Sequence, residues 1–339
     1  MGELMRAGRR PASVATLLAV FALAFAACGG DDDAGSSGGS SGSGPEKTTL
    51  KVGLIKIGDV LPFWVAEKQG FFKEAGFDSV TGTEMAGGAV IQPAVQSGQL
   101  DLGWSNNVSV ILAHAQNFDF KFFAGGVFLT PETLINQSIL VKKDSPIESA
   151  QDLVGKTIGM NTLGNLNELA AKAWLDREGV DPSKVKMVEL GTPLTVPPLV
   201  QGRVDASTAN EPAITIALAK GDVRVLADDP FAVFGEQPFL AGWMSTGKWL
   251  DENPRTAQAF GDAMQKSIDW IKANPDDANA LLTEKTGIPA AVVGKMVKST
   301  DKPEITPEDL QPYIDGAKKY GLMDETFDAS ELIWKAPAQ

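Results

Sequence analysis

The sequence predicts an α/β protein of two lobes, and two features of the chain support this prediction. Residues 50–78 have the pattern of a buried strand, a loop and two short helices. Two later segments, residues 93–106 (PAVQSGQLDLGWSN) and 198–210 (PLVQGRVDASTAN), resemble each other. Each combines a helix end, a glycine, a short strand that contains an aspartate, and a polar tip. We therefore expect two α/β lobes that share this local plan.

The first stretch also contains the first candidate for a binding surface. The apolar run at residues 50–55 is typical of a buried strand, and Gly58 and Asp59 end it. Pro62 begins a helix that Gly70 ends. Ligands of open α/β sheets bind beyond the carboxyl ends of the strands, so we expect the loop at residues 57–62 to face a ligand. Many α/β enzymes begin in the same way, and a fold does not determine a function. The stretch alone therefore does not distinguish a binding protein from an enzyme.

The segment before residue 28 is typical of an export signal. Residues 1–27 combine three arginines with an apolar run that is shorter than the roughly 20 residues of a membrane span. The junction FAAC, which ends in Cys28, resembles a bacterial lipobox, although Phe25 stands where that motif has leucine. We expect lipid attachment at Cys28, the only cysteine of the chain; an ordinary export signal remains the alternative.

The composition after Cys28 agrees with an anchored protein. Residues 28–47 are rich in Gly and Ser and predict a flexible tether. The formal net charge of the chain is −13, which argues against a nucleic-acid partner. We therefore expect an exported chain, held by its lipid on the outer face of the cytoplasmic membrane.

Four polar loops follow predicted strand ends, and we expect them to face one ligand cleft between the lobes. Their candidate ligand-binding residues are Asp59, Ser105, Asn106, Thr162, Asn165, Asn210 and Glu211. Some have a plainer alternative role. Thr162 or Asn165 would cap the helix at residues 166–178 in any case, and Glu211 precedes Pro212 as a helix start does.

Four aromatic residues near these loops are candidates for the walls of the cleft. They are Phe63, Trp64, Trp104 and Trp243. Each would supply an apolar or stacking surface to a ligand, or else pack in the core of a lobe. For Phe63 and Trp64, which are adjacent, we expect one to face the cleft and the other the core.

Several segments resemble the SsuA/TauA/THI5-like (NMT1-type) solute-binding proteins of ABC importers. The segment PFWVAEKQGFFKEAG at residues 62–76 is similar to the opening motif of that family. Five further segments follow in the order that the family shows. They are GQLDLG, VKKDSPIESAQDLVGKTIG, GVDPSKVKMVEL, VQGRVDASTANEP and DWIKANPDDA.

The resemblance implies a type II periplasmic-binding-protein fold, in which two crossing strands join the lobes and hinge closure traps a small ligand. On this basis we expect crossings near Gln137 and Pro238. Lobe 1 would then comprise residues 48–137 and 238–339, and lobe 2 residues 138–237. The implied partners are a membrane permease and its cytoplasmic ATPase, and the implied state is a monomer without cofactor or metal.

The ligand class is a weaker expectation. The family takes nitrate, bicarbonate, sulfonates, taurine and thiamine pyrimidine precursors. The candidate loops contain Asp59 and Glu211 but neither Arg nor His. This composition favours an amine-bearing or heteroaromatic, pyrimidine-like ligand, and leaves a sulfonate as the alternative.

Two other functions stay open. A sensory lipoprotein would have the same fold. A thiamine-pyrimidine enzyme of the family would use its own histidine and cysteines. This chain has one mid-helix histidine, His114, and only Cys28, so we expect no enzyme activity.

Overall fold

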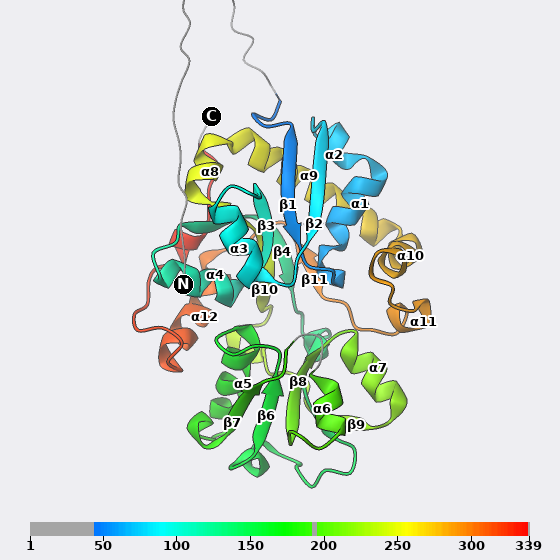
Figure 1. Cartoon of the computed structure of the whole chain (residues 1–339), viewed down its shortest axis with the longest axis vertical. Coiled ribbons are helices and arrows are strands. Elements are labelled where there is room, and N and C mark those ends of the chain that lie inside the picture. Colours follow the sequence, from blue (N-terminus) through cyan, green and yellow to red (C-terminus); the bar gives the residue numbers. More distant parts are fainter. Residues whose placement is uncertain (1–43, 192–194, 338–339) are drawn as a thin grey trace, which may run out of the picture. The chain divides into compact units, whose positions relative to one another are not determined.

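The computed structural model describes residues 44–191 and 195–337, which contain two β-sheets flanked by helices (Figure 1). The six-stranded sheet has the order β11-β4-β10-β3-β1-β2, and the five-stranded sheet the order β7-β6-β8-β5-β9. We call the first sheet with its helices lobe 1 and the second with its helices lobe 2. Among the described residues, no helix is both long and apolar enough to cross a membrane.

The sheet of lobe 1 is mixed. Its strands are β1 (Thr49–Leu54), β2 (Ser79–Glu84), β3 (Leu102–Asn106), β4 (Phe120–Phe128), β10 (Phe239–Thr246) and β11 (Thr300–Lys302). β1 pairs in parallel with β2 and β3, whereas β10 runs antiparallel between β3 and β4. The apolar residues of β1 are buried, which fits the strand predicted at residues 50–55.

Helices cover this sheet and account for most of the remaining residues of lobe 1. They are α1 (Leu61–Gln69), α2 (Phe71–Glu74), α3 (Gly88–Gln96), α4 (Asn107–Ala115), α8 (Gly247–Glu252), α9 (Pro254–Ala273), α10 (Pro275–Thr286), α11 (Ala290–Val293) and α12 (Pro307–Lys319). Short 3-10 turns lie at Gly58–Val60, Leu134–Asn136 and Ala329–Leu332. α1 ends where Gly70 adopts a left-handed backbone with φ of 80°, as predicted.

Lobe 2 is the smaller α/β unit. Its strands are β5 (Gln137–Lys142), β6 (Thr157–Met160), β7 (Lys186–Glu189), β8 (Ala206–Asn210) and β9 (Val223–Ala227). Its helices are α5 (Leu166–Arg177), α6 (Val196–Val200) and α7 (Ala213–Lys220), with 3-10 turns at Ala150–Leu153, Pro182–Lys184 and Ala232–Phe234. β6 pairs in parallel with β7 and β8, and β5 runs antiparallel beside β8.

The chain passes twice between the two sheets. β4 ends at Phe128 before β5 begins at Gln137, and β9 ends at Ala227 before β10 begins at Phe239. The two connections touch each other, because the Leu129 N–H donates to the Pro238 carbonyl at 3.0 Å. They form a pair of adjacent linkers of the kind at which lobes rotate.

Helix α12 departs from a simple division into two lobes. It packs on α4 of lobe 1 and also on α5 and the turn Ala232–Phe234 of lobe 2. Tyr313 of α12 stacks on Phe234 with ring centroids 4.0 Å apart, and Lys319 pairs with Asp176 at 2.6 Å. We therefore keep residues 48–137 and 238–339 against residues 138–237 as a proposed division, except that Gln137 belongs to β5 of lobe 2, and we treat α12 as a bridge.

The repeat predicted from the sequence has a structural counterpart. In lobe 1, Asp101 precedes β3 and its carboxylate accepts from the Lys51 N–H of β1 at 2.8 Å. In lobe 2, Asp205 precedes β8 and accepts from the Thr157 N–H of β6 at 2.9 Å. Each aspartate thus satisfies a backbone donor at the start of the neighbouring parallel strand, so the two lobes share the same local construction.

Two expectations about local structure need correction. We expected a loop at Ser105 and Asn106, but both belong to β3, and α4 begins directly at Asn107. We also assigned Glu46 to the tether. Its carboxylate accepts from the Thr256 N–H at 2.7 Å, because a negative charge is favourable at the amino end of α9. The predicted signal peptide, Cys28 and most of the tether lie outside the described residues.

Candidate ligand-binding site

Residues from both lobes line one cavity. Residues 57–59, which follow β1, contribute to its wall, as do Asn210, the last residue of β8, and Glu211, which follows it. Asn136 and Gln137, at the first connection between the sheets, complete this side. The cavity has a volume of about 90 Å³. The carboxyl ends of β1 and β8 therefore meet at this cavity, with Asp59, Asn210 and Glu211 in its wall; their contact with a ligand stays a prediction.

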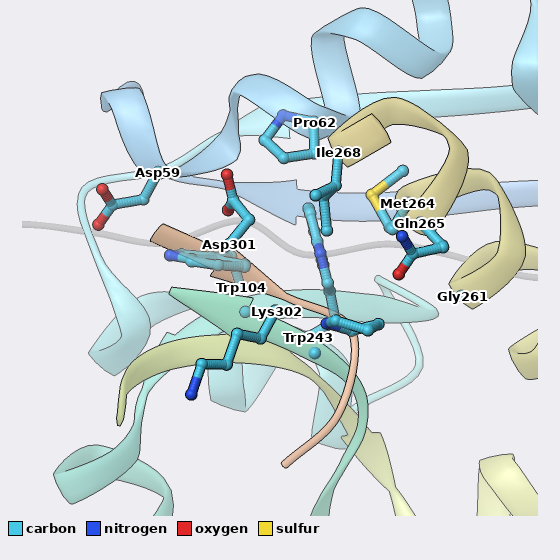
Figure 2. A pocket seen from close by; sticks show the side chains of 13 residues that line it. Asp59, Pro62, Trp104, Trp243, Gly261, Met264, Gln265, Ile268, Asp301 and Lys302 are labelled. Atoms are coloured by element: carbon cyan, nitrogen blue, oxygen red, sulfur yellow. The ribbon is translucent and has the colours of Figure 1, made fainter. Parts of the chain in front are cut away.

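A smaller cavity of about 20 Å³ adjoins the first one (Figure 2). Asp59 and Asp301 line both cavities, so the two spaces share one acidic wall. The smaller cavity is also lined by Trp104, Trp243 and Gln265. Its volume suffices for one water molecule or for a small polar group of a ligand.

Asp301 reaches the site because β11 lies close against β4. Lys302 pairs with Gly126 and Asp301 with Val127 in an antiparallel register. A Cβ atom at Gly125 would lie 1.8 Å from the Lys302 carbonyl oxygen, a distance that no side chain can occupy. Glycine at position 125 is therefore required for the approach that places Asp301 in the cavity wall.

The two shared carboxyl groups are poorly solvated. Burial raises the pKa of Asp59 to about 6, and a hydrogen bond from the Ser299 hydroxyl at 3.2 Å opposes the rise. Burial also raises the pKa of Asp301 to about 8, with a further contribution from the charge of Asp59, and Lys272 opposes this rise. At pH 7 the pair therefore holds about one proton.

Glu211 contributes to the cavity wall, but its carboxylate already has partners. It accepts from the Thr215 N–H at 3.1 Å and the Thr215 hydroxyl at 2.8 Å, so it caps α7. It also accepts from the Val297 N–H of lobe 1 at 3.3 Å. Asn136 donates to the carbonyl of the same Val297 at 2.6 Å. Glu211 thus holds a segment of lobe 1 against lobe 2 and is less available to a ligand than Asp59 or Asp301.

The positive charges near the cavities have partners of their own. Lys298 lines the larger cavity, and its ammonium donates to the Val293 carbonyl at 2.9 Å. Burial lowers the pKa of Lys298, which the charge of Glu211 opposes. The Lys302 ammonium is bonded to the Gln237 amide and lies 4.4 Å from the centre of the Phe128 ring. Among the described residues that line these two cavities, none is arginine or histidine.

The four aromatic candidates separate into two pairs. Trp104 and Trp243 line the smaller cavity, with ring centroids 4.9 Å apart and planes inclined at 70°. All four are at most 3% exposed and pack in the apolar core of lobe 1, so the pairs differ only in which cavity walls they reach. Neither Phe63 nor Trp64 lines a described cavity, so we no longer expect one of them to face the ligand.

Ser105 and Asn106 have structural partners at the end of β3. Ser105 is fully buried and accepts from the Gln92 side-chain amide of α3 at 3.1 Å. Asn106 caps α4 by accepting from the Ser109 N–H at 2.9 Å. Neither residue lines the two cavities described here.

Thr162 and Asn165 form a cap at the start of α5, which was the predicted alternative to a role in ligand binding. Asn165 accepts from the Asn167 N–H at 3.1 Å at the start of α5. Its own amide donates to the Thr162 hydroxyl at 2.5 Å. These side chains are absent from the walls of both cavities, so a role in ligand contact stays a prediction.

Sequence reasoning missed Asn136, Ser299 and Asp301. Asp301 lies on a three-residue edge strand, which is too short for an alternation of apolar residues to indicate. Asn136 precedes the expected crossing by one residue and is recognisable only once the connection between the sheets is known. The one usable signal is the pair Gly125-Gly126 in β4, since glycine inside a strand indicates close approach of another backbone.

His114 lies away from both cavities. Its ring packs on Phe327 with centroids 4.4 Å apart, and its Nε2 atom is 3.4 Å from the Glu331 carboxylate. Within the described residues, no group of three or more His, Cys, Asp or Glu side chains is arranged to hold a metal ion. The described part of the chain thus offers no histidine to a ligand in these cavities.

The model of the family described as NMT1/THI5 like matches residues 58–278. The chain belongs to this family. Among its relatives is the taurine-binding periplasmic protein of Escherichia coli, 26% identical over 271 residues, which cover 78% of this chain and 81% of the relative.

The NMT1/THI5-like family also includes enzymes. A 4-amino-5-hydroxymethyl-2-methylpyrimidine phosphate synthase of Saccharomyces cerevisiae is 24% identical over 226 residues, covering 63% of this chain and 64% of the enzyme. Among solved structures, the periplasmic aliphatic sulphonate binding protein SsuA of E. coli superposes with a TM-score of 0.73 at 22% identity, over 86% of this chain and 94% of that one. The fold is therefore that of periplasmic binding proteins, as the sequence predicted.

Proposed function

We propose that this chain is the solute-binding protein of an ABC importer. It captures a small solute outside the cytoplasm and delivers it to a membrane permease that a cytoplasmic ATPase drives. The observation that carries the proposal is the cavity lined by Asp59 of lobe 1 and by Asn210 of lobe 2. A solute that contacts both lobes favours the closed arrangement, because it binds that arrangement more tightly.

The hydrogen bonds at the connections support a hinge in this position. Leu129 and Pro238 join the two linkers, and Asn136 and Glu211 hold the backbone of Val297 across the lobes. Lobe rotation about such adjacent linkers is a common closing motion of binding proteins. The bridge made by α12 would limit how far the lobes separate on its side.

The ligand that suits these walls best is a small amine-bearing or heteroaromatic compound. Carboxyl groups of Asp59 and Asp301 attract N–H donors, and the indoles of Trp104 and Trp243 offer apolar and stacking surface. A sulfonate, the ligand named for several relatives, remains the alternative. It would lie beside two acidic groups with no arginine among the described lining residues, which is unfavourable.

The proposed location is the outer face of the cytoplasmic membrane, with Cys28 as the lipid attachment point. Periplasmic relatives agree with export of the domain. Loss of membrane association in a Cys28→Ala variant, measured by fractionation, is the expected result. Unchanged membrane association would contradict lipid attachment at this residue.

Thermal unfolding against a panel of solutes tests the proposed function. The panel holds amines, taurine, sulfonates, nitrate and pyrimidines. A solute at 100 times its dissociation constant stabilises the folded state by about 2.7 kcal/mol, which raises the unfolding midpoint by several degrees. We expect at least one class to do so with one site per chain. A panel without any stabilising solute would contradict a binding protein for these ligand classes.

A further inference from the structure

The acidic wall shared by the two cavities has unused hydrogen-bonding capacity. The Asp301 carboxyl forms no hydrogen bond or ion pair with any residue of the described chain. The Asp59 carboxyl accepts a single bond, from Ser299. Both side chains face the cavities from separate elements, Asp59 from the turn after β1 and Asp301 from β11 (Figure 2). Two partly buried carboxyl groups with so few partners are costly for the free protein.

A third acceptor lies in the smaller cavity and is independent of these carboxyl groups. Gln265 of α9 lines this cavity, and its Oε1 atom is buried without any hydrogen-bond partner. The Nε2 atom of the same amide donates to the exposed Asp269 carboxylate at 2.9 Å. A buried amide oxygen without a donor is open to a donor from a water molecule or from a bound group.

The charged groups around the pair leave its charge largely uncompensated. Lys302 is engaged with Gln237 and Phe128, and Figure 2 shows its amine directed away from the Asp301 carboxylate. Lys298 donates to a backbone carbonyl, and Glu211 adds a further negative charge to the larger cavity. Lys272 of α9 is the remaining cation that acts on Asp301.

We propose that Asp59 and Asp301 form a subsite for a protonated amine of the ligand, with the Gln265 amide oxygen as a separate acceptor for another donor group of the ligand. This inference rests on the proposed function, and it names the chemical class of the solute as a cation. The ammonium group donates to the two carboxylates, and Trp104 and Trp243 form part of the apolar lining of the smaller cavity.

The exchange balances in charge and in protons. Before binding, the pair holds about one proton at neutral pH, mainly on Asp301, because the pKa values of Asp59 and Asp301 are about 6 and about 8. An ammonium beside the pair favours both carboxylates, so this proton leaves to solvent as the cation enters. Affinity for an amine therefore rises between pH 6 and pH 8, while the amine itself stays protonated.

Methylammonium chloride is a probe that carries the proposed group and little else. The unfolding midpoint of the full-length protein is measured in methylammonium chloride, sodium chloride and sodium methanesulfonate at equal ionic strength. We expect methylammonium alone to raise the midpoint above the value in sodium chloride, and to raise it more at pH 8 than at pH 5. Equal midpoints in the three salts, or a rise with methanesulfonate alone, would overturn the inference.

Two substitutions and a matched control assign the effect to the site. Asp59→Asn and Asp301→Asn keep the side-chain shape, and each should remove at least half of the methylammonium effect. Asp78→Asn changes the same chemical group at an exposed position with no side-chain hydrogen bond in the described structure, and should leave the effect intact. If methylammonium raises the unfolding midpoint of both site variants as much as that of the wild type, the inference is also overturned. If a variant does not fold, the comparison of the wild type at pH 8 and pH 5 still tests the inference.

The outcome separates this inference from the proposed function. If sulfonates or nitrate stabilise the protein and methylammonium does not, the binding protein stands and the cationic subsite falls. If methylammonium stabilises the protein but none of the other solutes of the panel does, the subsite stands and the proposed importer role loses its support.

Discussion

Asp59 and Asp301 of lobe 1 come from distant parts of the sequence, yet they line the same two cavities. The charge of Asp59 contributes to the raised pKa of Asp301, so the two groups act as one titrating unit. Most other polar side chains named here cap helices or join the lobes. This pair is therefore the feature of the site most directly available to a ligand.

The first prediction concerns the pH dependence of stability in the absence of ligand. The pKa values of Asp59 and Asp301 in the folded protein, about 6 and about 8, lie above the ordinary aspartate value of 3.8. The folded state therefore binds more protons than the unfolded chain between about pH 4 and pH 8. The stabilisation from these protons is complete below pH 4 and is lost as the pH rises through 6 and 8.

Denaturant unfolding at several pH values measures this effect. We expect the double variant Asp59→Asn, Asp301→Asn to lose less stability than the wild type between pH 4 and pH 8, by on the order of 1–3 kcal/mol. The Asp78→Asn variant is the control and should follow the wild type. Parallel pH profiles for all three proteins would show that the two carboxyl groups titrate normally.

The second prediction concerns Gly125 and the position of β11. A Gly125→Ala side chain would collide with the Lys302 carbonyl and displace the strand that carries Asp301. We expect a loss of about 1–3 kcal/mol in unfolding free energy and weaker ligand binding. Gly87→Ala is the matched control, because a Cβ atom there meets nothing within 4 Å and its backbone is extended. Similar stability in the two variants would contradict the close approach.

The third prediction separates a helix cap from a ligand contact. Asn165→Ala should lower stability by about 1 kcal/mol through loss of the α5 cap and leave affinity nearly unchanged. Asn210→Ala should weaken ligand binding and leave stability nearly unchanged. Asn210 is exposed at the cavity and makes no side-chain hydrogen bond in the described structure. We expect its dissociation constant to rise about two- to tenfold. Calorimetric titration with a panel ligand measures affinity, and thermal unfolding measures stability. Lost affinity in Asn165→Ala together with lost stability in Asn210→Ala would refute this assignment.

The fourth prediction concerns Glu211. Its carboxylate accepts from Thr215 and Val297, so Glu211→Ala leaves donors without partners at α7 and at the lobe contact. We expect a loss of about 1–3 kcal/mol in stability, larger than that of Asn210→Ala. Weakened binding with an unchanged unfolding midpoint would show instead that Glu211 serves the ligand directly.

The sequence was sufficient to predict those features of the fold that depend on local sequence patterns. The repeat at residues 93–106 and 198–210 predicted two lobes of one plan, and Asp101 and Asp205 make equivalent bonds in them. Gly70 ends α1 because its left-handed backbone is open to glycine. The family resemblance predicted the binding-protein fold, and the match of the family model confirms membership.

The site itself was only partly predictable. Asp59 follows β1 and Asn210 ends β8, at the strand ends where α/β folds bind ligands, and both line a cavity; Trp104 lines the smaller cavity from within β3. Asp301 depends on tertiary pairing of a short edge strand with β4, which has no local signature. The burial of Phe63 depends on its packing against Phe72 of α2 and Trp243 of β10. Its position directly after Pro62 therefore gave no indication of whether it faces the cleft or the core.

The most direct test of a solute site at the acidic pair is the same solute panel applied to two proteins side by side. Unfolding midpoints are measured for the wild type and for the Asp59→Asn, Asp301→Asn double variant at pH 8. We predict that amine-bearing solutes raise the midpoint of the wild type and not that of the variant. Equal rises in both proteins, or a rise of the wild type with sulfonate or nitrate alone, would contradict a cation-binding solute site at these residues.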